Sequence, residues 1–349
     1  MDWNIFSLLT IDGLVNGSMY LLAGLGLVLV FSVTRVVFIP FGSIAVYAAF
    51  SLAAFQAGNV PATIGLVVIF ALLATIVEVV SLIRKHDVKR IPKAILCWGI
   101  LPLIPCALAW GVVKTQAPEY ALLIASILLV VPVGPLLGRI VFQPIANASV
   151  LVLLIVALAL EFVASGLALF FFGPEGIRTN SLVSGSLSFG SVTISAYVML
   201  VILSAVVVSV LFFFLFGRTL MGKALRATSI NRTGARLIGA RPERTAVIAY
   251  SVASLLAGFI GVLMSPQTTF YYDSGFLIGL KSFVAAIIGG LVSYPITAIG
   301  ALGVGIFESF ASFWNGELKE AIVFGLLIPI LLIRSWLASG GEEDEEDHE

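Results

Sequence analysis

Charged and chemically reactive side chains are scarce in this chain of 349 residues. Only 11% of the residues are charged, and there are two histidines and two cysteines. His86 and His348 lie outside every long apolar run, so no Ser-His-Asp set, Cys-His set or metal site can be built from them. Cys97 and Cys106 do not form a CxxC pair, and we expect them to act as small apolar side chains. This scarcity argues against an enzyme.

Long apolar runs dominate the chain instead. Hydrophobic residues make up 60% of it, and the mean hydropathy is +1.13. Runs such as 65–83 and 194–216 reach the roughly 20 apolar residues that span a bilayer as a helix. A membrane barrel would show short alternating strands. Residues 1–13 lack the basic region of a secretory signal, so we expect them to belong to the mature protein. The sequence predicts an all-α polytopic integral membrane helical bundle.

We predict about eight to eleven transmembrane helices, because eleven apolar segments can be marked. They run near 13–33, 41–57, 61–83, 94–113, 119–138, 148–172, 194–216, 245–265, 277–291, 296–313 and 321–335. Pro40 and Gly42 interrupt the apolar run over 33–43, which predicts a broken helix. Irregular backbone at membrane depth must be buried in protein or line a cavity. Small residues at every fourth position, such as Gly13 and Gly17, predict close helix packing inside one bundle rather than a dimer interface.

The basic residues orient this bundle. Residues 84–93 hold five Lys or Arg and residues 218–244 hold seven, and both loops should be cytoplasmic. Strict alternation then places 15 basic residues on the cytoplasmic side and four outside. We therefore predict an N-terminus outside and a cytoplasmic C-terminus. Residues 1–341 form the predicted transmembrane domain, and the acidic residues 342–349 form a disordered tail.

One nucleotide-binding motif is only apparent. Residues 217–224 read GRTLMGKA and fit G-x-x-x-x-G-K, but Ala224 stands where Ser or Thr would hold magnesium. The motif also follows an apolar membrane segment rather than a strand. We expect this chain to bind no cofactor and no metal, so any ATP and magnesium would be bound by another chain.

Three acidic residues lie in apolar segments. Glu161 is in the middle of its segment, where a charge costs about 3 kcal/mol, so it should be protonated, paired or facing a watery cavity. A pathway role and a structural role both remain open for it. Glu308 lies toward the outer end of its segment and could reach the interface, whereas Glu78 should pair with a base of the cytoplasmic loop.

The basic loop 218–244 carries its own helix signals. Asn231 is a good N-cap for a short helix through Ile238, Gly239 suits its C′ position, and Pro242 suits the first turn of the next helix. A helix lying on the lipid surface is one interpretation, but it would normally show bulky apolar residues. The many Gly and Ala residues favour insertion into a protein groove.

This loop also carries a resemblance to a known family. RTLMGKALRATSINRTGARLIGA (218–240) resembles the cytoplasmic coupling region of ABC importer permeases in the branched-chain amino acid family. In that family a Gly-x-Ala-x-Arg-Ala run is followed by Asn, then Ala, then Leu-x-Gly. Four further stretches resemble the family in the same order, namely 16–36, 139–145, 254–263 and 285–309. Together they cover most of 10–337.

The resemblance implies a permease subunit in a bacterial or archaeal cytoplasmic membrane. A periplasmic binding protein would deliver a small amphipathic solute such as a branched-chain amino acid. A second permease chain would complete the pathway, two cytoplasmic ATPase subunits would drive it, and no nucleic acid would take part. The residues expected to couple to the ATPase are Gly222, Arg226, Ala227, Asn231, Arg232, Gly234, Ala235, Arg236 and Gly239, with Arg241 beside them. Those expected in the pathway are Tyr20, Phe38, Phe41, Gly42, Ala157, Glu161 and Glu308.

The chain departs from the family pattern in places. Where the family usually has Asn-Phe-Ala-His-Gly, this chain reads Phe-Ile-Pro-Phe-Gly over 38–42. Where the family's middle helix usually has Ile-x-Thr-x-Gly, this chain reads Ile-Val-Ala-Leu-Ala over 155–159. The pathway should therefore be more apolar than usual, and segment 61–113 is longer than the family norm. The main alternative is a secondary transporter in which Glu161 and Glu308 carry coupling protons. A membrane scaffold without transport is a third possibility, which no specific feature of the sequence supports.

Overall fold

Helices make up nearly all the regular structure of the chain. The computed structural model describes residues 3–115, 117–181, 183, 185–189, 192–237, 239, 241–326, 328–330 and 332. Within these, eight helical spans are long and apolar enough to cross a membrane, and two shorter apolar helices accompany them. The spans are α1 (Trp3–Thr34), α3 (Thr63–Arg84), Val88–Lys114, Glu119–Phe142, α8 (Val150–Phe172), α9 (Ala196–Arg218), α12 (Pro242–Met264) and α14 (Tyr294–Trp314), and the shorter helices are α2 (Phe41–Gln56) and α13 (Ser274–Ile288). The predicted all-α polytopic bundle is confirmed.

Two of the spans are assembled from several helical pieces. Val88–Lys114 comprises a 3₁₀ turn η1 (Val88–Arg90), α4 (Ile91–Ala94), a π-helical stretch η2 (Ile95–Ile100) and α5 (Leu103–Lys114). Glu119–Phe142 comprises α6 (Glu119–Val130), α7 (Val133–Leu137) and a second π-helical stretch η3 (Gly138–Phe142). Pro102 and Pro132 stand directly before α5 and α7. Proline lacks an N–H donor and crowds the preceding turn, so these positions end one helical piece and begin the next.

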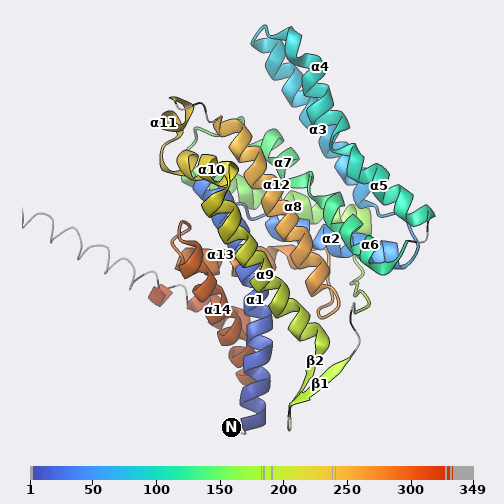
Figure 1. Cartoon of the computed structure of the whole chain (residues 1–349), viewed down its shortest axis with the longest axis vertical. Coiled ribbons are helices and arrows are strands. Elements are labelled where there is room, and N and C mark those ends of the chain that lie inside the picture. Colours follow the sequence, from blue (N-terminus) through green and yellow to red (C-terminus); the bar gives the residue numbers. More distant parts are fainter. Residues whose placement is uncertain are drawn as a thin grey trace, which may run out of the picture.

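Smaller elements connect and follow the spans. An antiparallel pair, β1 (Ser186–Phe189) and β2 (Val192–Ser195), lies between α8 and α9, with Ser186 opposite Ser195. Helices α10 (Leu220–Ile230) and α11 (Arg232–Leu237) join α9 to α12 (Figure 1). The predicted segment 321–335 begins within α15 (Lys319–Gly325), but residues 327, 331 and 333–335 lie outside the described residues. The predicted acidic tail 342–349 also lies outside them.

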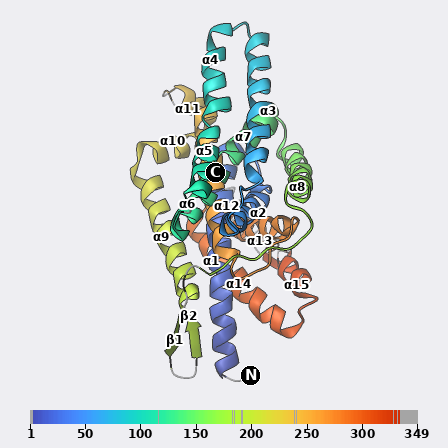
Figure 2. The same ribbon diagram turned by 90° about the vertical axis from the view of Figure 1, so that its right-hand side faces the viewer.

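Helix α1 runs through the molecule and packs closely against α12, α13 and α14 (Figures 1 and 2). A Cβ atom added to Gly13 would lie 2.5 Å from the Ile306 Cα atom, and one added to Gly17 would lie 2.8 Å from the Leu302 Cα atom. Only glycine permits this approach of two helix backbones. The small residues expected to serve close packing are therefore used inside one bundle, as predicted.

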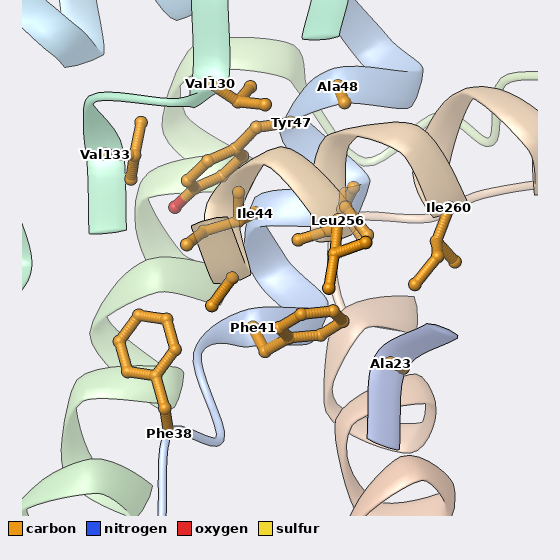
Figure 3. Packing of buried hydrophobic residues seen from close by; sticks show 14 of the residues in the cluster. Ala23, Phe38, Phe41, Ile44, Tyr47, Ala48, Val130, Val133, Leu256 and Ile260 are labelled. Atoms are coloured by element: carbon orange, nitrogen blue, oxygen red, sulfur yellow. The ribbon is translucent and has the colours of Figure 1, made fainter. Parts of the chain in front are cut away.

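The predicted break after the first helix is also confirmed. Helix α1 ends at Thr34, residues 35–40 are not helical, and α2 begins at Phe41. Arg35 takes a φ of 63°, which turns the chain. Phe38 and Phe41 are fully buried, and Figure 3 shows both among apolar side chains of α2, α12 and the α6–α7 region. The irregular backbone is thus enclosed by protein, as a segment at membrane depth requires.

The two ends of the molecule differ in charge. The turn between α3 and α4, which contains the basic residues 84–93, lies toward the same end as α10 and α11 (Figure 1). The N-terminus and the β1–β2 pair lie toward the opposite end. This arrangement is what the predicted orientation requires, since both basic segments must be on one side of the membrane.

The outward faces of several spans are apolar. Only 28% of the apolar window of α8 and 17% of that of α9 is buried inside the chain. Phe170 of α8 and Phe213 of α9 are 83% and 75% exposed. Such surfaces suit lipid or a partner helix rather than water.

Candidate functional site

The connection from α9 to α10 is a tight turn built around Gly222. The Thr219 hydroxyl accepts a hydrogen bond from the Gly222 N–H at 3.0 Å and caps α10. A Cβ atom on Gly222 would lie 2.6 Å from the Phe216 Cα atom, so the position excludes a side chain. Gly222 is buried against α9 and fixes the direction in which α10 leaves it.

The predicted capping of α11 is confirmed. The Gly234 N–H donates to the Asn231 Oδ1 atom at 2.9 Å, so Asn231 is the N-cap. Gly239 takes a φ of 88°, in the left-handed region that ends helices. Pro242 begins α12. The helix is shorter than predicted, since α11 covers Arg232–Leu237 and Ile238 lies outside the described residues.

The candidate coupling residues divide into exposed and buried ones. Ala235 is only 2% exposed, and Ala227 and Gly234 are half-buried. The side chain of Arg232 lies outside the part of the chain that the structure describes. We call the exposed candidates, together with the exposed Leu237 beside them, the coupling surface, and its members are Arg226, Asn231, Arg236, Leu237, Gly239 and Arg241.

Gly222 and Ala235 are therefore packed inside the chain, whereas the residues of the coupling surface are exposed. Arg236 is held in place by Glu243, with 3.0 Å between the Arg236 Nη2 and Glu243 Oε1 atoms. Exposed apolar side chains lie beside these charges, and the sequence reasoning missed two of them, Leu220 and Ile230. Leu220, Ile230 and Leu237 are each at least 78% exposed, so this end of the molecule presents apolar side chains among arginines.

Four of the pathway candidates belong to the packed core. Phe38, Phe41 and Ala157 are fully buried, and a Cβ atom on Gly42 would clash with the Gly275 backbone of α13. The Phe38 ring lies 5.1 Å from that of Tyr250, between ring centroids. Neither of the two cavities described below is lined by these four residues. In this conformation the region is filled by protein.

Glu161 is a fully buried acid that fastens α8 to α2. Its Oε1 atom accepts a hydrogen bond from the Ser43 hydroxyl at 2.7 Å. Its Oε2 atom is also buried and finds no hydrogen-bond partner among the described residues. The Tyr47 hydroxyl donates to the Ala164 carbonyl oxygen at 2.7 Å, one turn further along the same pair of helices. A lone buried carboxylate would be costly, so this environment favours the neutral acid among the three states that the sequence left open.

Glu308 lies in a buried polar cluster, which corrects the expectation that it could reach the membrane interface. Its Oε2 atom accepts from the Tyr20 hydroxyl at 2.6 Å, and its Oε1 atom accepts from Lys281 Nζ at 2.6 Å. Lys281 also donates to Glu320 Oε1 at 2.9 Å. The cluster joins α1, α13, α14 and α15. Since a buried charge must be paired, these distant residues explain why Glu308 is tolerated at 6% exposure.

Glu78 pairs with Arg139, and both side chains are mostly buried. Arg139 belongs to η3, so the partner is a base at the end of another span rather than one from residues 84–93. The expected pairing of Glu78 with a basic residue is confirmed, but the basic residue is Arg139.

Two of the cavities among the described residues bear on these side chains. The larger has a volume of about 430 Å³ and is lined by Leu9, Asp12, Val15, Asn16, Gln267, Glu308, Ser309, Ser312, Phe313 and Lys319. We call it the α1–α14 cavity, after the two helices that supply most of its lining. The smaller, of about 100 Å³, lies between residues 34–36, the α7–η3 region and the start of α12. The sequence reasoning had found only Glu308 among the polar residues of the larger cavity.

The chain is similar to known transport permeases over most of its length. The family described as "Branched-chain amino acid transport system / permease component" matches residues 9–331. The chain is 33% identical over 112 residues to the high-affinity branched-chain amino acid transport system permease protein BraD of Pseudomonas aeruginosa, covering 32% of this chain and 36% of BraD. It is 33% identical over 105 residues to the permease protein LivH of Escherichia coli, covering 28% of this chain and 33% of LivH.

These alignments span about a third of the length of each relative. No solved structure matches the chain significantly. The family match, in contrast, runs from α1 to beyond α15 and includes α10, α11 and the Glu308 cluster. The chain therefore belongs to the family of branched-chain amino acid transport permease components.

Proposed function

We propose that this chain is the membrane-spanning permease subunit of an ATP-driven importer for a branched-chain amino acid or a similar small amphipathic solute. The observation that carries the proposal is the coupling surface, because it presents arginines and exposed apolar side chains on two capped helices at the basic end. The family match over residues 9–331 and the names of the relatives supply the solute class.

The complex proposed around this chain contains a second permease chain, two cytoplasmic ATPase subunits and a periplasmic substrate-binding protein. It lies in the cytoplasmic membrane of a bacterial or archaeal cell. ATP and magnesium are bound by the ATPase subunits, and this chain hydrolyses nothing itself. The apolar outward faces of α8 and α9 are where lipid or the second permease chain is accommodated.

The proposed mechanism is a rigid-body movement that begins at α10 and α11. These helices are held at both ends, since Gly222 fixes the turn from α9 and Pro242 begins α12 directly after α11. The Thr245 hydroxyl of α12 donates a hydrogen bond of 3.3 Å to the Thr228 hydroxyl of α10, which adds a direct contact between these two helices. A displacement of the coupling surface by the ATPase pair would therefore move α9 and α12 with it.

Helix α12 carries this movement to the candidate pathway. Gly261 of α12 packs directly against the Ala45 carbonyl oxygen of α2, and Leu256 lies beside Phe41 in Figure 3. A shift of α12 relative to α1 would open the packed region around Phe38 and Phe41. An apolar lining there suits a solute with a branched hydrocarbon side chain.

The test is reconstitution of the chain with its cognate ATPase, second permease and binding protein in proteoliposomes. Arg226→Glu combined with Arg241→Glu reverses two exposed charges of the coupling surface. The proposal takes the ATPase surface that meets these arginines to be acidic, so the reversed charges would repel it. We therefore expect ATP-driven uptake of leucine and co-purification of the ATPase to fall about tenfold or more.

The matched control is Lys89→Glu combined with Lys93→Glu, which reverses two exposed charges of the other basic segment. This control should retain uptake. Uptake that continues without ATP and stops when the proton gradient is collapsed would reject the proposal in favour of the secondary transporter that uses Glu161 and Glu308.

A further inference from the structure

The α1–α14 cavity carries charges of both signs in an otherwise apolar protein. Asp12 and Asn16 come from one face of α1, Glu308 from α14, and Lys319 from the start of α15. The cavity volume of about 430 Å³ lies within the range of roughly 300–1,000 Å³ that is typical of small-molecule sites. Apolar side chains of Leu9, Val15 and Phe313 complete the lining.

The two lysines in and behind the cavity differ in how tightly they are ion-paired. Lys281 is almost fully buried and is committed to two carboxylates, with its Nζ atom 2.6 Å from Glu308 Oε1 and 2.9 Å from Glu320 Oε1. Lys319 is only loosely paired, with 3.9 Å between its Nζ atom and Glu320 Oε1, and its side chain is 37% exposed. Lys319 is therefore the base that can meet a ligand, whereas Lys281 holds the cavity wall in place.

The two acids that line the cavity also differ in their partners. Both carboxylate oxygens of Glu308 accept hydrogen bonds within the cluster, from Tyr20 and Lys281. Asp12, on α1, is exposed and lines the cavity. Counting the lining together with the ion pairs behind it, Asp12, Glu308 and Glu320 stand against Lys281 and Lys319. One negative charge is left over, so the cavity attracts a positive group while Lys319 can still meet a negative one.

We propose that the α1–α14 cavity binds the charged end of a zwitterionic amino acid, with Asp12 receiving the ammonium group and Lys319 receiving the carboxylate. The Asn16 amide and the Ser312 hydroxyl supply neutral hydrogen bonds. Leu9, Val15 and Phe313 contact the hydrocarbon side chain. This inference rests on the proposed function for the solute class, and it assigns a site and two residues that select the zwitterion.

The test is equilibrium binding of radiolabelled L-leucine to the purified full-length chain in phospholipid nanodiscs. Isoamylamine keeps the ammonium group and the side chain of leucine, and isocaproate keeps the carboxylate and the side chain. Loss of one charge-assisted contact should weaken binding about tenfold. Both analogues should therefore compete with leucine at least tenfold less well than leucine itself.

Variants that keep shape but remove charge identify the two poles. Lys319→Gln should weaken leucine and isocaproate about tenfold and leave isoamylamine unchanged, whereas Lys319→Arg should retain binding. Asp12→Asn should weaken leucine and isoamylamine and leave isocaproate unchanged. Both residues are at least partly exposed, so neither substitution removes a buried contact. Glu317→Gln is the control, because this exposed acid lies near Lys319 in the chain but does not line the cavity.

Three results would overturn the assignment. They are an absence of leucine binding, equal competition by the two analogues and leucine, and variants whose leucine affinity stays within twofold of the wild type. Any of these together with intact ATP-driven uptake would reject this site and leave the proposed function standing. A different result would support the site and reject the proposed function. In it, Lys319→Gln weakens isocaproate but not isoamylamine, Asp12→Asn does the reverse, and the full complex shows no ATP-driven uptake.

Discussion

Replacing Lys281 with methionine would leave two carboxylates without their shared cation. Lys281 is 6% exposed, and its ammonium group lies within 2.9 Å of both Glu308 and Glu320. Removing one partner of a buried ion pair costs about 3–5 kcal/mol, because the remaining charge is buried and uncompensated. Glu320 is 31% exposed and can turn toward water, so most of this cost arises at Glu308.

The magnitude can be measured as a shift of the thermal unfolding midpoint. With roughly 2–4 °C per kcal/mol for a chain of this size class, Lys281→Met should lower the midpoint by on the order of 10 °C. The assay is the loss of monodisperse protein on heating in detergent, read by size-exclusion chromatography. Lys89→Met, at an exposed position in the basic loop, should leave the midpoint unchanged.

A second substitution separates charge from packing. Glu308→Gln in the Lys281→Met background removes the buried negative charge and keeps an oxygen that accepts from the Tyr20 hydroxyl. The double variant should regain most of the lost stability, because no unpaired charge is then buried. A double variant less stable than Lys281→Met alone, or a single variant as stable as the wild type, would refute this account of the cluster.

Two further predictions concern packing and the second buried acid. Gly17→Leu should prevent accumulation of folded protein, because its Cβ atom would lie 2.8 Å from the Leu302 Cα atom. The control Gly303→Leu, on the open face of α14, should accumulate normally. Equal yields of the two variants would contradict the close α1–α14 contact. Glu161→Gln still accepts a hydrogen bond from Ser43, so we expect unchanged yield of folded protein and a reduced rate of reconstituted leucine uptake. Wild-type uptake kinetics in this variant would mean that Glu161 only anchors α8.

The features that the sequence predicted well are those set by local rules. Apolar length is dictated by the thickness of the bilayer, so most spans could be found without any tertiary information. The cap at Asn231, the left-handed Gly239 and the first-turn Pro242 depend only on backbone groups within a few residues, and the structure has each of them. The break before Phe41 follows from Pro40 in the same way.

The environment of Glu308 could not be found by such rules. Its partners Tyr20 and Lys281 stand 288 and 27 residues away in the chain, and they meet it only because α1, α13 and α14 pack together. The α1–α14 cavity has the same origin, since Asp12 and Lys319 lie near opposite ends of the sequence. Acids in apolar segments signalled that partners must exist, but only the packing of the helices identified them.

The division between tightly and loosely packed helices bears on how the molecule could move. Close backbone contacts at Gly13 and Gly17 join α1 to α14, and those at Gly42 and Gly261 join α2 to α13 and to α12. Helix α9 is only 17% buried over its apolar window, yet it leads directly into α10 through the fixed turn at Gly222. A force on α10 and α11 therefore acts on one weakly held helix, α9, and on one strongly held helix, α12. Since packed helices are displaced as a unit rather than deformed, the proposed opening movement is best placed between the group of α2, α12 and α13, which α12 would carry, and the pair of α1 and α14.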